Sequence, residues 1–201
     1  IKGQGTVGLI TYLRTDSTRI SVEADAAAKE YIKEAYGAEF VGAGTVAKKD
    51  DKKVQDAHEA IRPTYMTNSP ASIKDELSRD QFRLYQLIWN RFMASRMAPA
   101  KYENTSVKIA AGDYRFNASA SKIAFDGFLS VYNINNEKSE GNVMLKSIDE
   151  DTKLTLNNLE PKQHFTQPPA HYTEASLVKT LEEFGIGRPS TYAPTISTIT
   201  A

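Results

Sequence analysis

Residues 8–17 read Gly-Leu-Ile-Thr-Tyr-Leu-Arg-Thr-Asp-Ser, and the rest of the chain is organised around them. If the stretch is extended, Tyr12, Arg14 and Asp16 point to one side, because side chains alternate along a strand. A free phenol is protonated at neutral pH and is a poor nucleophile. A neighbouring guanidinium stabilises the phenolate and offers an incoming phosphate two parallel N–H donors. The stretch therefore indicates chemistry on a phosphate, although a tyrosine two residues before an arginine also occurs by chance in many proteins.

A second stretch, residues 55–64, reads Gln-Asp-Ala-His-Glu-Ala-Ile-Arg-Pro-Thr. On a helical turn His58 and Arg62 are four residues apart and share a face. Pro63 then ends the turn, because the residue before a proline disfavours the helical conformation. A single histidine is most often structural or simply exposed. The arginine one turn away is what makes this stretch a candidate site.

A third stretch, residues 185–193, reads Gly-Ile-Gly-Arg-Pro-Ser-Thr-Tyr-Ala and precedes a predicted helix, with Pro189 in its first turn. The free N–H groups at a helix N-terminus can seat a phosphate. Arg188, Ser190 and Thr191 are therefore candidate phosphate ligands. A purely structural helix cap explains the two hydroxyl residues equally well.

The composition excludes several classes of protein. The 201 residues carry 25 basic and 25 acidic side chains, so any surface for a polyanion is a local patch. No cysteine is present, which excludes disulfides and thiolate zinc sites and fits a reducing, cytoplasmic compartment. No run approaches the length of about eighteen apolar residues that a membrane span needs. Because the chain starts with Ile1, we read it as a piece of a longer protein.

Two helices are predicted in the first half of the chain. Ser21 caps the first, and Gly37 stops it. Its expected buried face consists of Ala28, Ile32, Ala35 and Tyr36. Ser78 and Gln81 form a capping box for the second, over residues 79–97. Its expected core stripe consists of Phe82, Tyr85, Ile88, Trp89, Phe92 and Met93, and its arginines Arg79, Arg83, Arg91 and Arg96 are expected at the surface.

Further elements follow from local signals. A short helix is expected around residues 71–77. Alternating residues on both sides of Gly112-Asp113 predict a β-hairpin. Thr173 caps a predicted helix at 174–184, which ends before Gly185. Further short strands are expected at 125–131, 143–148 and 154–156, and solvated loops at 48–53 and 133–142.

Taken in order, the stretches at 8–17, 55–64 and 165–195 resemble bacterial type IA DNA topoisomerases of the topoisomerase I kind. Leu13 stands where topoisomerase I enzymes usually carry methionine and topoisomerase III enzymes proline, which favours the first subfamily. The resemblance spans essentially the whole chain. It is least distinctive between residues 100 and 160.

The resemblance implies an ATP-independent transesterification. Tyr12 would attack a phosphodiester of single-stranded DNA and form a 5′-phosphotyrosine link, and the complete enzyme would relax negatively supercoiled DNA. Arg14 would clamp the scissile phosphate, and His58 would donate a hydrogen bond to it. From the shared face alone, and not from the resemblance, we expect Asp16 to orient His58 or Arg14. Supporting or DNA-binding roles would fall to Arg62, Arg188, Ser190 and Thr191.

The resemblance also implies an α+β, multi-lobe fold. A helical, winged-helix-like lobe at 1–97 would carry the tyrosine, a β-rich antiparallel arch would span 98–168, and a helical DNA-binding domain would start at 169–201. The toprim domain, whose carboxylates hold Mg²⁺ in the family, and the zinc-ribbon tail would lie outside this chain. We therefore expect no metal ligands here, little cleavage by the isolated chain, and a monomer in the cytoplasm near the nucleoid.

Three other readings stay open. The same arginine and hydroxyl surfaces could hold single-stranded DNA without cutting it, as a non-catalytic binding module. The chain could also belong to a topoisomerase III or to a reverse gyrase, which flanking sequence would decide. A plain structural domain with chance motifs is the remaining alternative.

Overall fold

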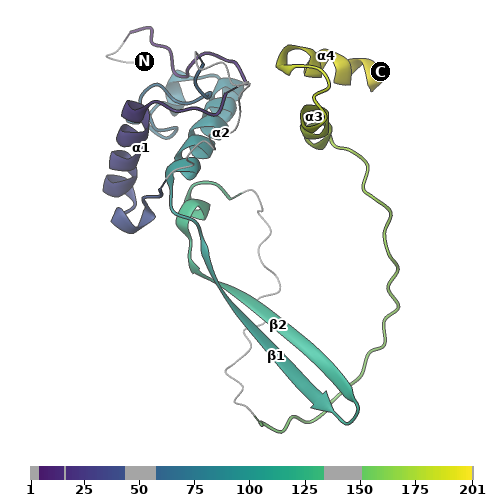
Figure 1. The fold of residues 1–201 in the computed structure, drawn as a ribbon. Helices are drawn as coiled ribbons and strands as arrows, with labels where there is room; N and C mark the ends of the chain where they lie inside the picture. The colour runs from purple at the N-terminus through teal and green to yellow at the C-terminus, as the bar shows by residue number, and fades with distance from the viewer. Residues whose placement is uncertain (1–4, 16, 44–57, 134–150, 201) are drawn as a thin grey trace. The chain divides into compact units, whose positions relative to one another are not determined.

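The computed structural model describes residues 5–15, 17–43, 58–133 and 151–200. The chain divides into two compact units, residues 1–146 and 147–201, and each is described by itself. The described part mixes helices with a two-stranded antiparallel sheet, as the α+β prediction requires (Figure 1). None of the helices in these ranges is both long and apolar enough to cross a membrane.

Helix α1 (Val22–Ala35) begins and ends where the sequence predicts. The Ser21 hydroxyl accepts a hydrogen bond from the Ala24 N–H, which satisfies one of the free donors of the first turn. Beyond the helix, Gly37 has φ 115°, a backbone conformation that residues with a Cβ rarely adopt. The buried face of α1 consists of Ala24, Ala28 and Ile32. The prediction that Ala35 is buried was wrong, because that residue lies on the exposed side of the last turn.

Helix α2 (Arg79–Arg96) starts with the predicted capping box between Ser78 and Gln81. Four of its apolar side chains are buried, namely Tyr85, Trp89, Phe92 and Met93. Phe82 and Ile88, at the margins of the predicted stripe, are only half-buried. The stripe is therefore core, as its helical spacing predicts.

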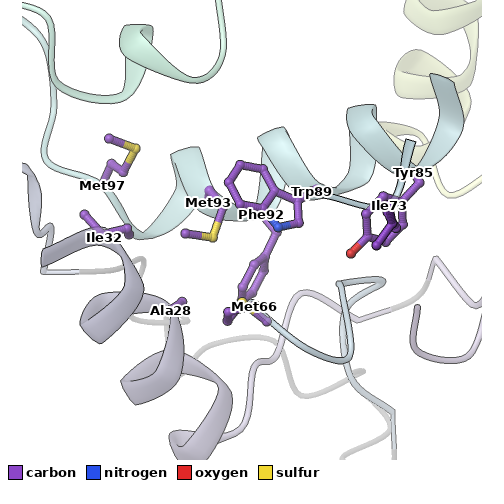
Figure 2. Close-up of a cluster of buried hydrophobic side chains, with 9 residues drawn as sticks. All are labelled: Ala28, Ile32, Met66, Ile73, Tyr85, Trp89, Phe92, Met93 and Met97. Atoms are coloured by element: carbon purple, nitrogen blue, oxygen red, sulfur yellow. The ribbon is translucent and has the colours of Figure 1, made fainter. Parts of the chain in front are cut away.

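The core lies between the two helices and the segment that precedes α2 (Figure 2). Ala28 and Ile32 come from α1, while Met66 and Ile73 come from the segment before α2. The Tyr31 ring meets Trp89 edge to face, with ring centroids 5.6 Å apart, an arrangement that aromatic quadrupoles favour. Each large apolar side chain that is fully buried here contributes about 1.5–3 kcal/mol. This burial fixes α1 against α2.

Arg96 is buried, which corrects the prediction of a surface arginine. Its Nη1 donates to the Asp25 carboxylate at 3.0 Å, and its Nε donates to the Ser95 hydroxyl at 3.3 Å. Lys29 also pairs with Asp25 at 2.6 Å. Burial alone would raise the pKa of the Asp25 carboxyl, but the hydrogen bonds from Lys29 and Arg96 outweigh it and hold that pKa below its usual value.

This ion pair predicts a stability that depends on pH. Because the pKa of Asp25 is lower in the folded state, its contribution is present above the ordinary value of 3.8 and is lost as the pH falls through the folded-state pKa. Asp25→Asn is expected to lower the free energy of unfolding by about 2–3 kcal/mol at neutral pH. Urea unfolding of both proteins between pH 3 and 7 measures this. A difference that stays constant below pH 3.8 would contradict the assignment.

The β-hairpin is confirmed and is longer than predicted. Strands β1 (Lys101–Ala111) and β2 (Tyr114–Phe125) pair antiparallel, with Ile109 opposite Phe116. Gly112 has φ 62° in the turn, which glycine adopts without strain. The Phe125 ring packs on Phe40 at 4.7 Å between centroids, which joins the base of the hairpin to the segment after α1.

Two of the other strand predictions were wrong. Residues 127–130 form the 3₁₀ helix η3 (Gly127–Ser130), which starts at Gly127 with φ 51°, outside the range of a strand. Gly127 also packs so closely on the main chain of Ala98 and Pro99 that an added Cβ would clash. Residues 154–156 lie in a stretch without helix or strand. The predicted strand at 143–148 lies outside the described residues, as do the loops predicted at 48–53 and, apart from Asn133, at 133–142. The short helix expected at 71–77 is only the 3₁₀ helix η2 (Lys74–Glu76), and a further one, η1 (Ala38–Phe40), follows α1.

The second unit contains α3 (Glu174–Glu183) and α4 (Pro189–Ile199), both predicted. Thr173 caps α3 through the Ser176 N–H. At its end, the Ile186 N–H donates to Leu181 O at 2.8 Å and the Gly185 N–H to Glu182 O at 3.0 Å. With Gly185 at φ 67° this is a Schellman motif, which explains why glycine stops the helix.

Candidate active site

The first two sequence stretches lie side by side in the structure. Ile10 and Pro63 form an antiparallel bridge, with Thr11 N–H donating to Arg62 O at 2.9 Å and Thr64 N–H donating to Leu9 O at 3.0 Å. Pro63 stands at the pair of this ladder that exchanges no hydrogen bond, so its missing N–H leaves no gap. The pairing brings residues 58–64 against the tyrosine stretch.

The predicted helical turn is wrong for residues 58–62, which are not helical. Their main-chain groups bond to flanking segments instead, with the Ala60 N–H donating to Arg19 O at 2.8 Å. His58 and Arg62 consequently have separate contacts. The Arg62 guanidinium binds the Glu59 carboxylate at 2.7 and 3.0 Å and the Pro63 carbonyl at 3.0 Å. Arg62 thus helps to hold the local backbone.

The backbone pairing ends at Thr11, and Tyr12 is the first residue beyond it. The Arg14 N–H donates to Tyr12 O at 2.9 Å, which closes a three-residue turn centred on Leu13. Simple strand alternation therefore stops at Tyr12. The Tyr12 side chain is 77% exposed and Leu13 is 67% exposed. The phenol is on the surface and accessible to a macromolecular substrate.

Arg14, two residues after Tyr12 in the sequence, contacts His58 in the structure. Arg14 Nη1 lies 3.4 Å from His58 Nε2, although 44 residues separate them along the chain. A guanidinium can only donate, so Nε2 is the atom that can accept in this contact. The structure therefore brings together the arginine and histidine that the sequence singles out in separate stretches.

Arg19 is a neighbour of the site that sequence reasoning missed. Its Nε donates to His58 O at 3.4 Å and its carbonyl accepts from Ala60, while its side chain is exposed. Its N–H donates to the hydroxyl of buried Ser17 at 3.1 Å, which anchors it. Two arginines, Arg14 and Arg19, thus contact His58. The sequence feature that could have identified Arg19 is its position as a second arginine within a few residues of Tyr12.

The structure does not test the remaining candidates against this surface. Asp16 lies outside the described residues, so its orienting role stays a prediction. Arg188, Ser190 and Thr191 are in the second unit at the N-terminus of α4. There the Thr191 hydroxyl accepts from the Arg188 N–H at 2.9 Å and donates to Arg188 O at 2.9 Å. That hydroxyl acts as a helix cap, while the phosphate seat at this terminus stays a prediction.

Histidine, aspartate and glutamate side chains are the possible metal ligands of this chain. Across the described ranges, no three histidine, aspartate or glutamate side chains gather closely enough to hold a metal ion. Mg²⁺ takes oxygen ligands in a near-octahedral arrangement and is commonly bound through only one or two carboxylates. That this chain holds no Mg²⁺ ligand therefore stays a prediction.

Comparison with known proteins gives two findings. A family model described as DNA topoisomerase matches residues 5–201. A solved structure described as full-length topoisomerase I from Thermotoga maritima, in a monoclinic crystal form, is 39% identical, with a TM-score of 0.70. The match covers 96% of this chain and 30% of that one. The chain thus spans less than a third of the length of this solved protein.

Proposed function

Because the chain belongs to the bacterial type IA DNA topoisomerase family, we propose that it carries the tyrosine nucleophile of such an enzyme. Tyr12 forms a transient covalent link with single-stranded DNA, and the complete enzyme relaxes negatively supercoiled DNA without ATP. One observation carries the proposal. An exposed phenol lies two residues from a guanidinium that contacts an imidazole from a distant stretch of the chain.

The proposed reaction conserves the number of phosphate ester bonds. The Tyr12 oxygen forms a bond to the scissile phosphorus, and the bond from phosphorus to the 3′ oxygen breaks. The phenol loses its proton, and the departing 3′ oxygen gains one. Because the phosphotyrosine retains the ester bond, the 3′-hydroxyl can reverse the step without an energy source.

Arg14 is assigned to the scissile phosphate. Its guanidinium neutralises the charge that builds on the phosphoryl oxygens in the transition state, and its planar donors match two of them. In its neutral form His58 accepts from Arg14 at Nε2. In its protonated form the Nε2–H donates to the same phosphate instead. Arg19, whose Nε donates to the His58 carbonyl, is assigned to an adjacent phosphate.

Mg²⁺ is proposed as a cofactor of the complete enzyme only. As the family resemblance implies, its ligands are assigned to parts of the enzyme outside this chain. When bound there, the ion would stabilise negative charge on phosphate oxygens. No role of Tyr12, Arg14 or His58 in this proposal depends on contact with the metal.

Trapping of the covalent adduct tests the proposed function. The complete enzyme, denatured during reaction with a single-stranded oligonucleotide and Mg²⁺, is expected to retain a label placed at the 3′ end of the DNA. A label at the 5′ end should leave with the released fragment, because the protein is joined to the 5′ phosphate of the downstream piece. Retention of the 5′ label instead would contradict the assigned polarity.

The isolated 201-residue chain is expected to form on the order of 100-fold less adduct than the complete enzyme, because it lacks much of the electrostatic stabilisation of the transition state. The same denaturing gel measures this. Adduct at the level of the complete enzyme would show that cleavage needs nothing outside this chain.

A non-catalytic single-stranded DNA-binding module is the second candidate for the isolated chain. The exposed Arg14 and Arg19, both in contact with His58, favour it. Phosphate contacts of this kind make binding weaken as salt rises. A module of this kind would bind equally well with Tyr12→Phe. Assignment to topoisomerase III or to reverse gyrase remains a matter for the flanking sequence.

A further inference from the structure

We propose that Thr11 is a positioning residue whose hydroxyl sets the alignment of Tyr12 with Arg14 and His58. The inference rests on the proposed function, because it concerns the geometry of the same cleavage step. Thr11 directly precedes the nucleophile in the chain. It makes its hydrogen bonds with the segment that carries the histidine.

Two polar groups of Thr11, its main-chain N–H and its hydroxyl, bond to residues 60–62. The main-chain N–H donates to Arg62 O at 2.9 Å. The hydroxyl donates to Ala60 O at 2.9 Å and accepts from the Arg62 N–H at 3.0 Å. These groups are partly buried, and the partners are 49 and 51 residues away along the chain. One short side chain therefore joins the two stretches that make up the site.

The hydroxyl is needed because the ladder ends at this point. After the bridge between Ile10 and Pro63, the Tyr12 carbonyl accepts from Arg14 within the tight turn. The Thr11 hydroxyl, rather than a main-chain carbonyl, accepts the Arg62 N–H. Threonine suits this role, because its β-branch restricts χ1 and keeps the hydroxyl in one orientation.

The hydrogen bonds of the Thr11 hydroxyl are made close in the chain to both Tyr12 and His58. Tyr12 is the next residue after Thr11, and His58 is two residues before Ala60. With the Thr11 hydroxyl in place, the backbone carrying the phenol and the backbone carrying the imidazole cannot slide past one another. A shift of about 1 Å between reacting groups can cost on the order of 100-fold in rate. The hydroxyl therefore acts on catalysis through Tyr12 and His58, without touching DNA.

The experiment compares Thr11→Val, which keeps the shape and removes the hydroxyl, with Thr11→Ser, which keeps the hydroxyl. The matched control is Thr64→Val. Its hydroxyl bonds to Gly8 O at 2.6 Å on the same ladder, but it accepts no main-chain N–H there and is farther from Tyr12 in the chain. Each variant is studied in the 201-residue chain by amide hydrogen exchange and in the complete enzyme by single-turnover cleavage.

Thr11→Val is expected to speed exchange of the Arg62 amide about tenfold or more, because that N–H loses its acceptor. In the complete enzyme it should slow cleavage on the order of 100-fold, while the affinity for the oligonucleotide changes by no more than about twofold. Thr11→Ser should restore both readouts to within about threefold of the wild type, and Thr64→Val should leave cleavage within the same range.

Cleavage by Thr11→Val at the wild-type rate, with a faster Arg62 amide, would overturn the proposal and leave Thr11 a purely structural residue. An equal slowing by Thr64→Val would also overturn it, because general loosening of the ladder would then suffice. If Thr11→Val does not fold, Thr11→Ala takes its place with the same expectations.

Tyr12→Phe separates the positioning role of Thr11 from the proposed function of the chain. If Tyr12→Phe removes the adduct and Thr11→Val cleaves normally, only the positioning role fails. If Tyr12→Phe still forms adduct, the proposed function fails.

Discussion

Replacing Tyr12 by phenylalanine in the complete enzyme is expected to abolish the covalent protein–DNA adduct and the relaxation of supercoiled DNA. The substitution removes one oxygen atom from a side chain that is 77% exposed, so it leaves no cavity and no unpaired buried group. That oxygen is the atom assigned to bond with phosphorus. Without it no covalent intermediate can form, and the loss should be complete, unlike the partial losses that follow removal of a transition-state donor.

The measurement is a denaturing gel with 3′-labelled oligonucleotide, together with a melting curve of each protein. Tyr65→Phe serves as the matched control, because Tyr65 is another exposed tyrosine of the same unit, at 55%. It should give the adduct at the wild-type level. Persistent adduct in the Tyr12 variant would move the nucleophile to another residue.

Met93→Ala is expected to lower the free energy of unfolding of this chain by about 3 kcal/mol. Met93 is fully buried in the cluster between α1 and α2, in the same cluster as Ile32 and Trp89 (Figure 2). Truncation removes the transfer free energy of the lost atoms and leaves a cavity in a close-packed interior. The unit that contains the candidate site should then unfold at a lower urea concentration.

Fluorescence of Trp89 reports this unfolding directly, since the chain contains one tryptophan and it lies in the core. Leu87→Ala on the same helix is the matched control. Leu87 is 55% exposed, so its removal should change the free energy of unfolding by no more than about 0.5 kcal/mol. Equal effects of the two substitutions would show that the cluster does not stabilise the fold.

Elements with local signals could be predicted from the sequence. Ser78 with Gln81 and Thr173 with Ser176 cap their helices within four residues, and Gly185 ends α3 through bonds to the turn just before it. The hairpin turn at Gly112 is equally local. In each case the partners are close along the chain, so residue type and spacing contain the information.

Predictions that depended on distant partners failed. Residues 58–62 have a helical pattern, but their backbone groups bond to Thr11 and Arg19, and those bonds override a weak helix preference. Arg96 looks like a surface residue of α2, yet it is buried because Asp25 on α1 neutralises it. Gly127 begins a 3₁₀ helix instead of a strand, and the main chain of Ala98 and Pro99 lies against it.

The sequence by itself determined the family, the tyrosine and arginine of the candidate site, the caps and the hairpin, because these depend on residue identity and short spacings. Only the tertiary structure decided that His58 contacts Arg14 and that Thr11 joins the two stretches. The physical reason is that hydrogen bonds between groups 44 to 51 residues apart are made only when the chain folds back on itself. The local pattern of residue types does not predict these long-range hydrogen bonds.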